Sequence, residues 1–136
     1  AVKQGVMVLP ANKGKGLANI TKMVTLRGFT PFPYMDQISS KKIEVMEVNY
    51  AGAAINIVAS DRVDGAYMGV MAANYVMSET LNKAGMLVFD DSLPYATADF
   101  FFFSIAHPEV IKQMYEFLVK EKATVTKLKA KYKIVE

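Results

Sequence analysis

A glycine-rich turn at residues 12–16, with the sequence Asn-Lys-Gly-Lys-Gly, is the first stretch of the chain that could bind a ligand. It follows an apolar run that ends at Pro10, and proline cannot donate to a β-ladder. A turn between a strand and a helix N-terminus presents free backbone N–H groups and a positive dipole end. We therefore expect an anion to bind at Asn12, Lys13 and Gly14. The alternative is an ordinary βα turn with solvated lysines.

The spacing of the glycines excludes two phosphate-binding motifs. The pattern GxxxxGK[ST] is absent, and the pattern GxGxxG fails because Asn19 stands in place of its third glycine. The anion expected at this turn is therefore a carboxylate or phosphate held by main-chain amides and lysine charge.

The carboxyl ends of the predicted strands form a second candidate site, because ligands of open α/β sheets bind outside those ends. Four segments are expected to meet at one edge: residues 10–12, 49–52, 68–71 and 90–92. Asn49 and Tyr50 could donate hydrogen bonds there, Tyr50 could stack on a ligand, and Gly69 could allow a close backbone approach. A half-buried tyrosine at a strand end is the alternative for Tyr50.

Catalytic and metal chemistry find little support in the sequence. Asp90 and Asp91 could bind a metal or an ammonium group, but adjacent strand residues point opposite ways, so a solvated turn is favoured. His107 is the only histidine, and its place before Pro108 is typical of a helix start. The chain has no cysteine and no GxSxG nucleophile elbow. We therefore predict a non-enzyme without catalytic residues, cofactor or metal.

Length and composition limit the class of protein. A chain of 136 residues is predicted to form one domain over residues 1–136. A hydrophobic fraction of 52% argues against disorder. The net charge of +3 is small beside the clustered basic charge of nucleic-acid-binding domains, so no nucleic-acid partner is expected. No segment reaches the roughly 18 apolar residues of a membrane span.

Residues 42–77 organise the rest of the chain, with a pattern of strand, helix, strand and helix. β-branched residues recur in the first strand, which ends near Val48. Apolar residues then follow helical spacing at 53–58, and a second apolar run covers 63–70. A helix between two strands implies a right-handed crossover and a parallel pair, which needs helices on its faces.

The flanking segments complete a layered fold. The patterns predict strands at 5–9 and 86–89, helices at 17–26 and 71–81, and a loop or irregular link into a short helix at 29–37. Residues 97–105, with four consecutive phenylalanines, are either a buried strand or a hydrophobic link, and two helices follow His107. The predicted fold class is α/β, a three-layer α/β/α sandwich. Its mostly parallel five-stranded sheet has one antiparallel strand, expected near the end of the chain.

Two features allow an interaction role. The nine methionines and the phenylalanine run are expected in the core, with a flexible ligand pocket or a partner interface as the alternative. Residues 120–133 predict a basic amphipathic helix, for which a solvated face is favoured over nucleic acid or membrane.

Three stretches resemble a known family. They are residues 3–8 (Lys-Gln-Gly-Val-Met-Val), residues 61–67 (Asp-Arg-Val-Asp-Gly-Ala-Tyr), and residues 107–134, which begin His-Pro-Glu and end Tyr-Lys-Ile. They are similar to the opening of the second lobe, the Gly-Arg-Val-Asp-Ala motif and the closing helices of bacterial periplasmic solute-binding proteins. That family has the type II periplasmic-binding fold used in amino-acid transport.

The resemblance implies a two-lobed protein that closes on a solute, of which this chain is one lobe with the closing helices. The family often holds a ligand carboxylate at the first helix N-terminus, a role that falls to Asn12 here. Amino-acid binders of the family often place an aspartate where this chain has Gly69, so a small anion that is not an amino acid fits better. Asp64 is expected to shape its turn without touching ligand.

The function expected from the sequence is therefore a periplasmic or extracellular solute-binding lobe for a small anionic metabolite. Its partners would be a membrane permease or a signalling module. The ligand-binding residues predicted are Asn12, Lys13, Gly14, Asn49, Tyr50 and Gly69. The alternative is a degenerate domain of the same fold that has lost ligand binding and serves protein interaction or forms a homodimer.

Overall fold

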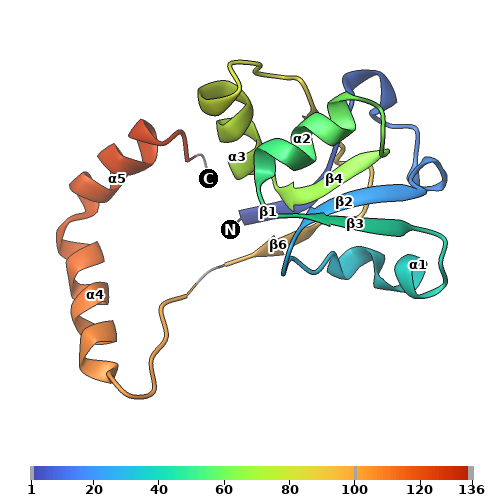
Figure 1. Ribbon diagram of the computed structural model, residues 1–136. Helices are drawn as coiled ribbons and strands as arrows, with labels where there is room; N and C mark the ends of the chain where they lie inside the picture. Colours follow the sequence, from blue (N-terminus) through green and yellow to red (C-terminus); the bar gives the residue numbers. More distant parts are fainter. Residues whose placement is uncertain (1, 100, 135–136) are drawn as a thin grey trace. The chain divides into compact units, whose positions relative to one another are not determined.

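The computed structural model describes residues 2–99 and 101–134. The chain divides into two compact units (Figure 1), one formed by Val2–Ala98 and the other beginning at Asp99. The first unit is a β-sheet flanked by helices, and the second is helical. The single lobe predicted over residues 1–136 stays a prediction.

Six strands form one sheet in the first unit. They are β1 (Val2–Val8), β2 (Lys22–Leu26), β3 (Glu44–Val48), β4 (Gly65–Gly69), β5 (Val88–Phe89) and β6 (Ala96–Ala98). The order is β3-β2-β4-β1-β5, and β6 pairs with β1. β2 pairs in parallel with β3 and β4, whereas β1 is antiparallel to β4, β5 and β6. The mostly parallel α/β sheet is confirmed, but its one reversed strand is the first and not a late one.

The expected count of five strands is wrong because residues 17–26 do not form a helix. They contain a 3-10 turn, Leu17–Asn19, followed by β2. Met23 and Val24 are both fully buried, and they belong to different core clusters on the two faces of the sheet. A strand buried on both faces has consecutive apolar residues, and such a run cannot be told from a helix by period alone.

Helices cover both faces of the sheet and make the three predicted layers (Figure 1). Helices α2 (Ala51–Ala59) and α3 (Val70–Tyr75) lie on one face, and α3 continues as a π-helical segment, Val76–Thr80. The core on this side includes Met7, Ile55, Val58, Met68 and Met77. The short helix α1 (Met35–Ser39) follows the 3-10 turn Phe32–Tyr34 on the other face, where Val6, Met23, Tyr34 and Tyr67 pack.

Residues 101–103 of the phenylalanine run form a link and not a buried strand. β6 ends at Ala98, and residues 101–103 have no regular secondary structure. Phe101, Phe102 and Phe103 are 76%, 57% and 79% exposed, so the core role predicted for them is wrong. Phe100 lies outside the described residues. The core role predicted for methionine holds for Met7, Met23, Met68 and Met77, among others.

The second unit contains two helices, α4 (Pro108–Lys120) and α5 (Lys122–Lys131). His107 precedes α4 as predicted, and its ring Nδ1 lies 3.3 Å from Glu109 Oε1 at the surface. No residue of either helix is buried. Val110, Met114 and Phe117 line an open pocket of about 350 Å³ on α4. This unit therefore exposes an apolar face. Separately, no helix in the described chain has the length and apolar character that crossing a membrane requires.

Limited proteolysis with chymotrypsin is expected to cut first within residues 101–103. Exposed backbone without regular structure is the preferred substrate of proteases, and phenylalanine is the residue that chymotrypsin selects. The fragment that ends there retains both core clusters of the sheet and is expected to resist further cleavage. Mass spectrometry of the fragments measures this. Replacing Phe101, Phe102 and Phe103 by glutamine should slow the first cut, and first cuts inside the sheet would refute an independently stable unit.

Candidate functional site

Three parallel strands end together at one edge of the sheet, which we call the carboxyl edge. The register pairs Leu26 with Val48 and Thr25 with Tyr67. β4 ends at Gly69, two residues beyond Tyr67, and Arg27, two residues beyond Thr25, donates its N–H to the carbonyl of Val48 at 2.9 Å. The structure thus brings together Asn49, Tyr50 and Gly69, as the sequence predicted for these three residues.

Helix α2 begins at this edge without a side-chain cap. Tyr50 is its N-cap residue and has an extended backbone, and no side chain accepts a hydrogen bond from the first turn. Ala53 and Ala54 N–H donate to the carbonyl of Tyr50. The first N–H groups of a helix have no acceptor within it, so those of Ala51 and Gly52 face outward at the positive end of the helix dipole. An anionic group could accept from them.

The side chains of the carboxyl edge are open to solvent. Tyr50 is 67% exposed, and Asn49, Arg27 and Thr30 are exposed as well. Gly69 has an ordinary extended backbone, and a Cβ atom placed there would meet Ala72 Cβ at 3.8 Å, an ordinary contact. Gly69 therefore leaves the end of β4 bare although a side chain would fit.

Residues 27–30 also belong to this edge. The sequence pattern, with a helix predicted at 17–26 and a loop or link at 29–37, does not place them at a strand end. In the structure Phe29 N–H donates to the carbonyl of Leu26, which folds residues 27–30 into a turn directly after β2. The β-branched pair Val24 and Thr25 was the available signal for a strand.

The other three predicted residues, Asn12, Lys13 and Gly14, lie at the opposite end of the sheet. β1 runs antiparallel to β4, so its start, Gln4, pairs with Gly69, and Met7 pairs with Ala66. The chain leaves Val8 at the end of the sheet where β4 begins, about 14 Å from Gln4 at 3.4 Å per residue. The expectation that all the predicted segments meet at one edge is therefore wrong.

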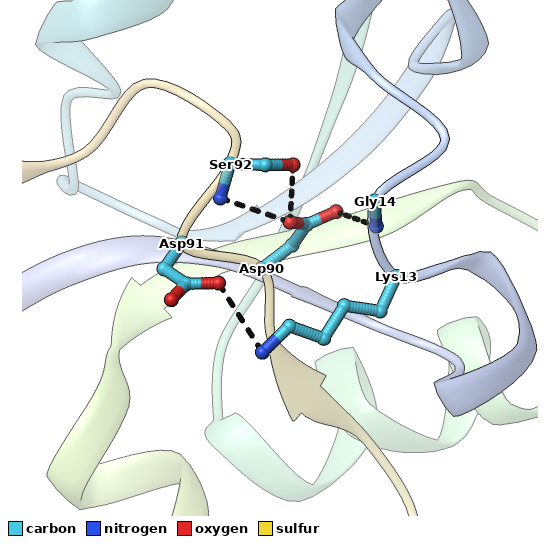
Figure 2. Close-up of polar contacts among 5 residues, drawn as sticks. All are labelled: Lys13, Gly14, Asp90, Asp91 and Ser92. Carbon is cyan, nitrogen blue, oxygen red and sulfur yellow. Dashed lines mark hydrogen bonds and ion pairs between the residues drawn. The ribbon is translucent and has the colours of Figure 1, made fainter.

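The glycine-rich turn already holds an anion that belongs to the chain itself (Figure 2). Gly14 N–H donates to Asp90 Oδ2 at 2.8 Å, and Lys13 Nζ lies 3.2 Å from Asp91 Oδ1. The other carboxylate oxygen, Asp90 Oδ1, accepts from Ser92 N–H at 3.1 Å and from Ser92 Oγ at 2.6 Å. The amide that was expected to bind a solute is thus used to join two distant loops.

Asp90 is 1% exposed, so the solvated turn predicted for it is wrong, whereas Asp91 remains at the surface. Burial alone would raise the pKa of Asp90. Hydrogen bonds from Ser92 and Gly14, together with the charge of Lys13, outweigh that effect and hold the pKa below its ordinary value. Asp90 is therefore a charged structural residue and not a free ligand group.

Asp64 has the turn-shaping role expected of it. Its Oδ2 accepts hydrogen bonds from Thr21 N–H, Thr21 Oγ1 and Lys22 N–H at 2.8 to 3.0 Å. These bonds fix the start of β2 beside the start of β4. Asp64 also lines a pocket of about 160 Å³ at this end of the sheet, with Asn12, Lys15 and Asp90 among its other walls. Lys15 Nζ donates a hydrogen bond to Asn12 Oδ1 there, at 2.6 Å.

Neither a protein-family model nor a curated protein matches this sequence. Solved structures do match. The periplasmic binding protein of an arginine transport system from Legionella pneumophila has a TM-score of 0.66 and 14% identity, over 96% of this chain and 61% of its own. An ancestral amino-acid-binding protein, a precursor of cyclohexadienyl dehydratase, has a TM-score of 0.63 and 19% identity, over 96% and 57%.

The GLUR0 ligand-binding core in complex with L-glutamate has a TM-score of 0.58 and 13% identity, over 96% of this chain and 58% of its own. The chain thus spans about three-fifths of the length of these proteins. At such identities the shared property is the fold. The chain therefore has the fold of one lobe, with the helices that follow it, of a type II periplasmic binding protein, as the sequence resemblance implied.

Proposed function

We propose that this chain is the solute-binding lobe of an extracytoplasmic binding protein, and that it binds a small carboxylate-bearing solute at the carboxyl edge. One observation carries the proposal. Three parallel strands of a binding-protein fold end beside a turn, residues 27–30, and beside the uncapped N-terminus of α2. Sheets of this kind bind ligands outside such strand ends.

Binding would be non-catalytic. The carboxylate would accept hydrogen bonds from the main-chain N–H groups of Gly28 and Thr30 and from those of Ala51 and Gly52. Tyr50 would cover the ligand with its exposed ring. A second lobe would close over the solute, which is the motion expected of two-lobed binding proteins. The closed form would then be read by a membrane permease or by a signalling module.

The net charge of the solute is a separate question from its carboxylate. The sequence predicted an anionic metabolite, but the similar structures are named for arginine, which is cationic, and for glutamate, which is anionic. Both compounds carry a carboxylate. The proposal therefore concerns that group, and the amino acids and simple organic acids are the compounds to test.

The test is a backbone amide NMR titration of the 136-residue chain with L-arginine, L-glutamate and succinate, because NMR detects the weak binding expected of half a cleft. We expect shifts at residues 27–30, 49–52 and 69–71. Shifts confined to residues 12–16 would place the site at the opposite end of the sheet and contradict the proposal. A spectrum that none of the three compounds changes would also count against it.

A protein-interaction role is the second candidate, and the helical unit favours it. Neither α4 nor α5 has a buried residue, and the preceding link exposes Phe101 and Phe103. Exposed apolar groups of this extent are typical of surfaces that contact a partner. Sedimentation velocity over a hundredfold concentration range tests one form of this role, since a homodimer would sediment faster as concentration rises. A constant monomer value would exclude it.

A further inference from the structure

A pocket of about 380 Å³ lies beside α1, at the end of the sheet opposite the carboxyl edge, and we call it the α1 pocket. One side is formed by residues of the stretch 17–21, which leads into β2. The other side is formed by Gln37 of α1 and by Lys42 and Ile43, which precede β3. β2 and β3 both begin here, so the length of β2, roughly 16 Å for five residues, separates the α1 pocket from the carboxyl edge. It is therefore a different site from the one proposed above.

The walls of the α1 pocket are mostly apolar, and internal contacts hold them in place. Ile20 and Ile43 are buried members of one core cluster, and Leu17 packs against that cluster. Ile20 N–H donates to the carbonyl of Leu17 at 3.0 Å, and Ile43 N–H donates to the carbonyl of Gln37 at 3.2 Å. Small-molecule sites in proteins likewise have apolar walls that are largely formed before the ligand enters. The volume of the α1 pocket also falls within their usual range, about 300 to 1,000 Å³.

The side chain of Gln37 is an unpartnered polar group in this pocket. Its Oε1 atom is buried, and no described residue donates a hydrogen bond to it. A buried amide oxygen without a donor is unfavourable, and native proteins usually satisfy it from the chain, a water or a ligand. The hydroxyl of Thr21, on the facing side, is already used, because it donates to Asp64 Oδ2 at 3.0 Å. Since no described residue fixes the Gln37 amide, a turn of its side chain can bring Oε1 to a ligand in the pocket.

The charge around the pocket selects the class of ligand. Lys42 is the one charged residue among the described residues that line it, and it is exposed, so its ammonium group can stay in solvent. The apolar walls offer no partner to a charged group, and burying an unpaired charge is costly. From these contacts we infer that the α1 pocket binds a compact, uncharged ring compound whose single N–H or O–H group donates to Gln37 Oε1. The ring packs on Ile20 and Ile43.

The test compares two compounds of nearly the same shape. Indole has an N–H donor, and benzofuran has an oxygen atom in its place. In amide NMR titrations of the 136-residue chain, indole should shift residues of the stretch 17–21 together with residues 37, 42 and 43. We expect indole to bind about tenfold more tightly than benzofuran, because only indole can donate to Gln37 Oε1.

Three variants sharpen the experiment. Gln37→Met removes the acceptor and keeps the length of the side chain, so it should fold normally and bind the two compounds within about twofold of each other. Gln4→Met, in β1, makes the same change outside the pocket and should leave the preference for indole unchanged. Ala18 is exposed and lines the pocket, so Ala18→Phe should fill the space and abolish the binding of both compounds.

Equal affinity for indole and benzofuran in the original chain would overturn the inference, as would a preference for indole that survives in Gln37→Met. Indole shifts confined to other residues, or none up to the solubility of indole, would overturn it as well. Each of these results leaves the proposed function standing, because carboxylates are expected to shift residues 27–30, 49–52 and 69–71. Conversely, a chain that responds to indole at the α1 pocket and to none of the carboxylates would support this inference and overturn the proposed function.

Discussion

Gly65→Ala is expected to lower the free energy of unfolding by about 2 to 3 kcal/mol, near the upper end for overpacking in a core. Gly65 is buried at the start of β4, between β2 and β1. A Cβ atom there would overlap Val6 Cγ1 and lie 3.3 Å from the main-chain oxygen of Met7. Val6 is itself fully buried and β-branched, so it cannot rotate away without displacing its neighbours.

Gly69→Ala is the matched control, four residues along the same strand. Its added Cβ meets only Ala72 at 3.8 Å, so its stability should change by less than about 0.5 kcal/mol. Urea unfolding followed by circular dichroism measures both variants. Equal midpoints for the two would show that β4 is not packed against β1 at Gly65 as described.

Asp90→Asn is expected to cost about 2 to 3 kcal/mol, although the two side chains have the same shape. One carboxylate oxygen accepts from Gly14 and the other from Ser92, so both sides of the group face donors. An amide has one oxygen. Whichever way it is turned, its NH₂ faces a main-chain N–H donor, that of Gly14 or that of Ser92, in a site that is 1% exposed, and that hydrogen bond is lost.

Asp91→Asn is the control for Asp90, because it removes an equal charge from the next residue. Its ion pair with Lys13 lies at the surface, where solvent screening keeps the change within about 0.5 kcal/mol. Thermal unfolding of both variants at neutral pH makes the comparison. A loss for Asp91→Asn as large as that for Asp90→Asn would contradict the role assigned to the buried bonds.

The pH dependence of stability follows from the same carboxylate. The pKa of Asp90 is lower in the folded chain than its ordinary value, so folding favours the charged form. Its contribution to stability is therefore complete above the unfolded value, about 3.9. That contribution is lost as the pH falls from there through the folded pKa. Asp90→Asn should accordingly flatten the stability curve below pH 4 and leave its shape above pH 6 unchanged.

The two ends of the sheet thus have different roles in this chain. At one end, Asp64 accepts main-chain hydrogen bonds that fix the start of β2 beside the start of β4, and Asp90 joins the glycine-rich turn to residues 90–92. At the other, the guanidinium of Arg27 makes no ion pair with a described residue, and no side chain caps the first turn of α2. The proposed function uses this division, because it needs an open edge beside a base that internal hydrogen bonds hold together.

Local pattern was enough to predict several elements from the sequence alone. The unit β3, α2, β4 and α3 was predicted because its apolar residues repeat with the period of a strand or helix, which depends only on nearby residues. The start of α4 at Pro108 was predicted because proline favours the first position of a helix, which is also a local property. Asn49, Tyr50 and Gly69 were placed together because these elements also fix which strand ends meet.

The tertiary structure decided what depends on strand partners. Whether residues 22–26 form a strand depends on their burial between β3 and β4, since a continuous apolar run fits either period. The direction of β1 is set by its antiparallel pairing with β4, and it separates Asn12 from Gly69. The sequence around Asp90 predicts a solvated loop carboxylate. In the structure it is buried and accepts a hydrogen bond from Gly14 N–H, 76 residues earlier in the chain. Each of these outcomes is a contact between residues far apart in sequence, which no local pattern encodes.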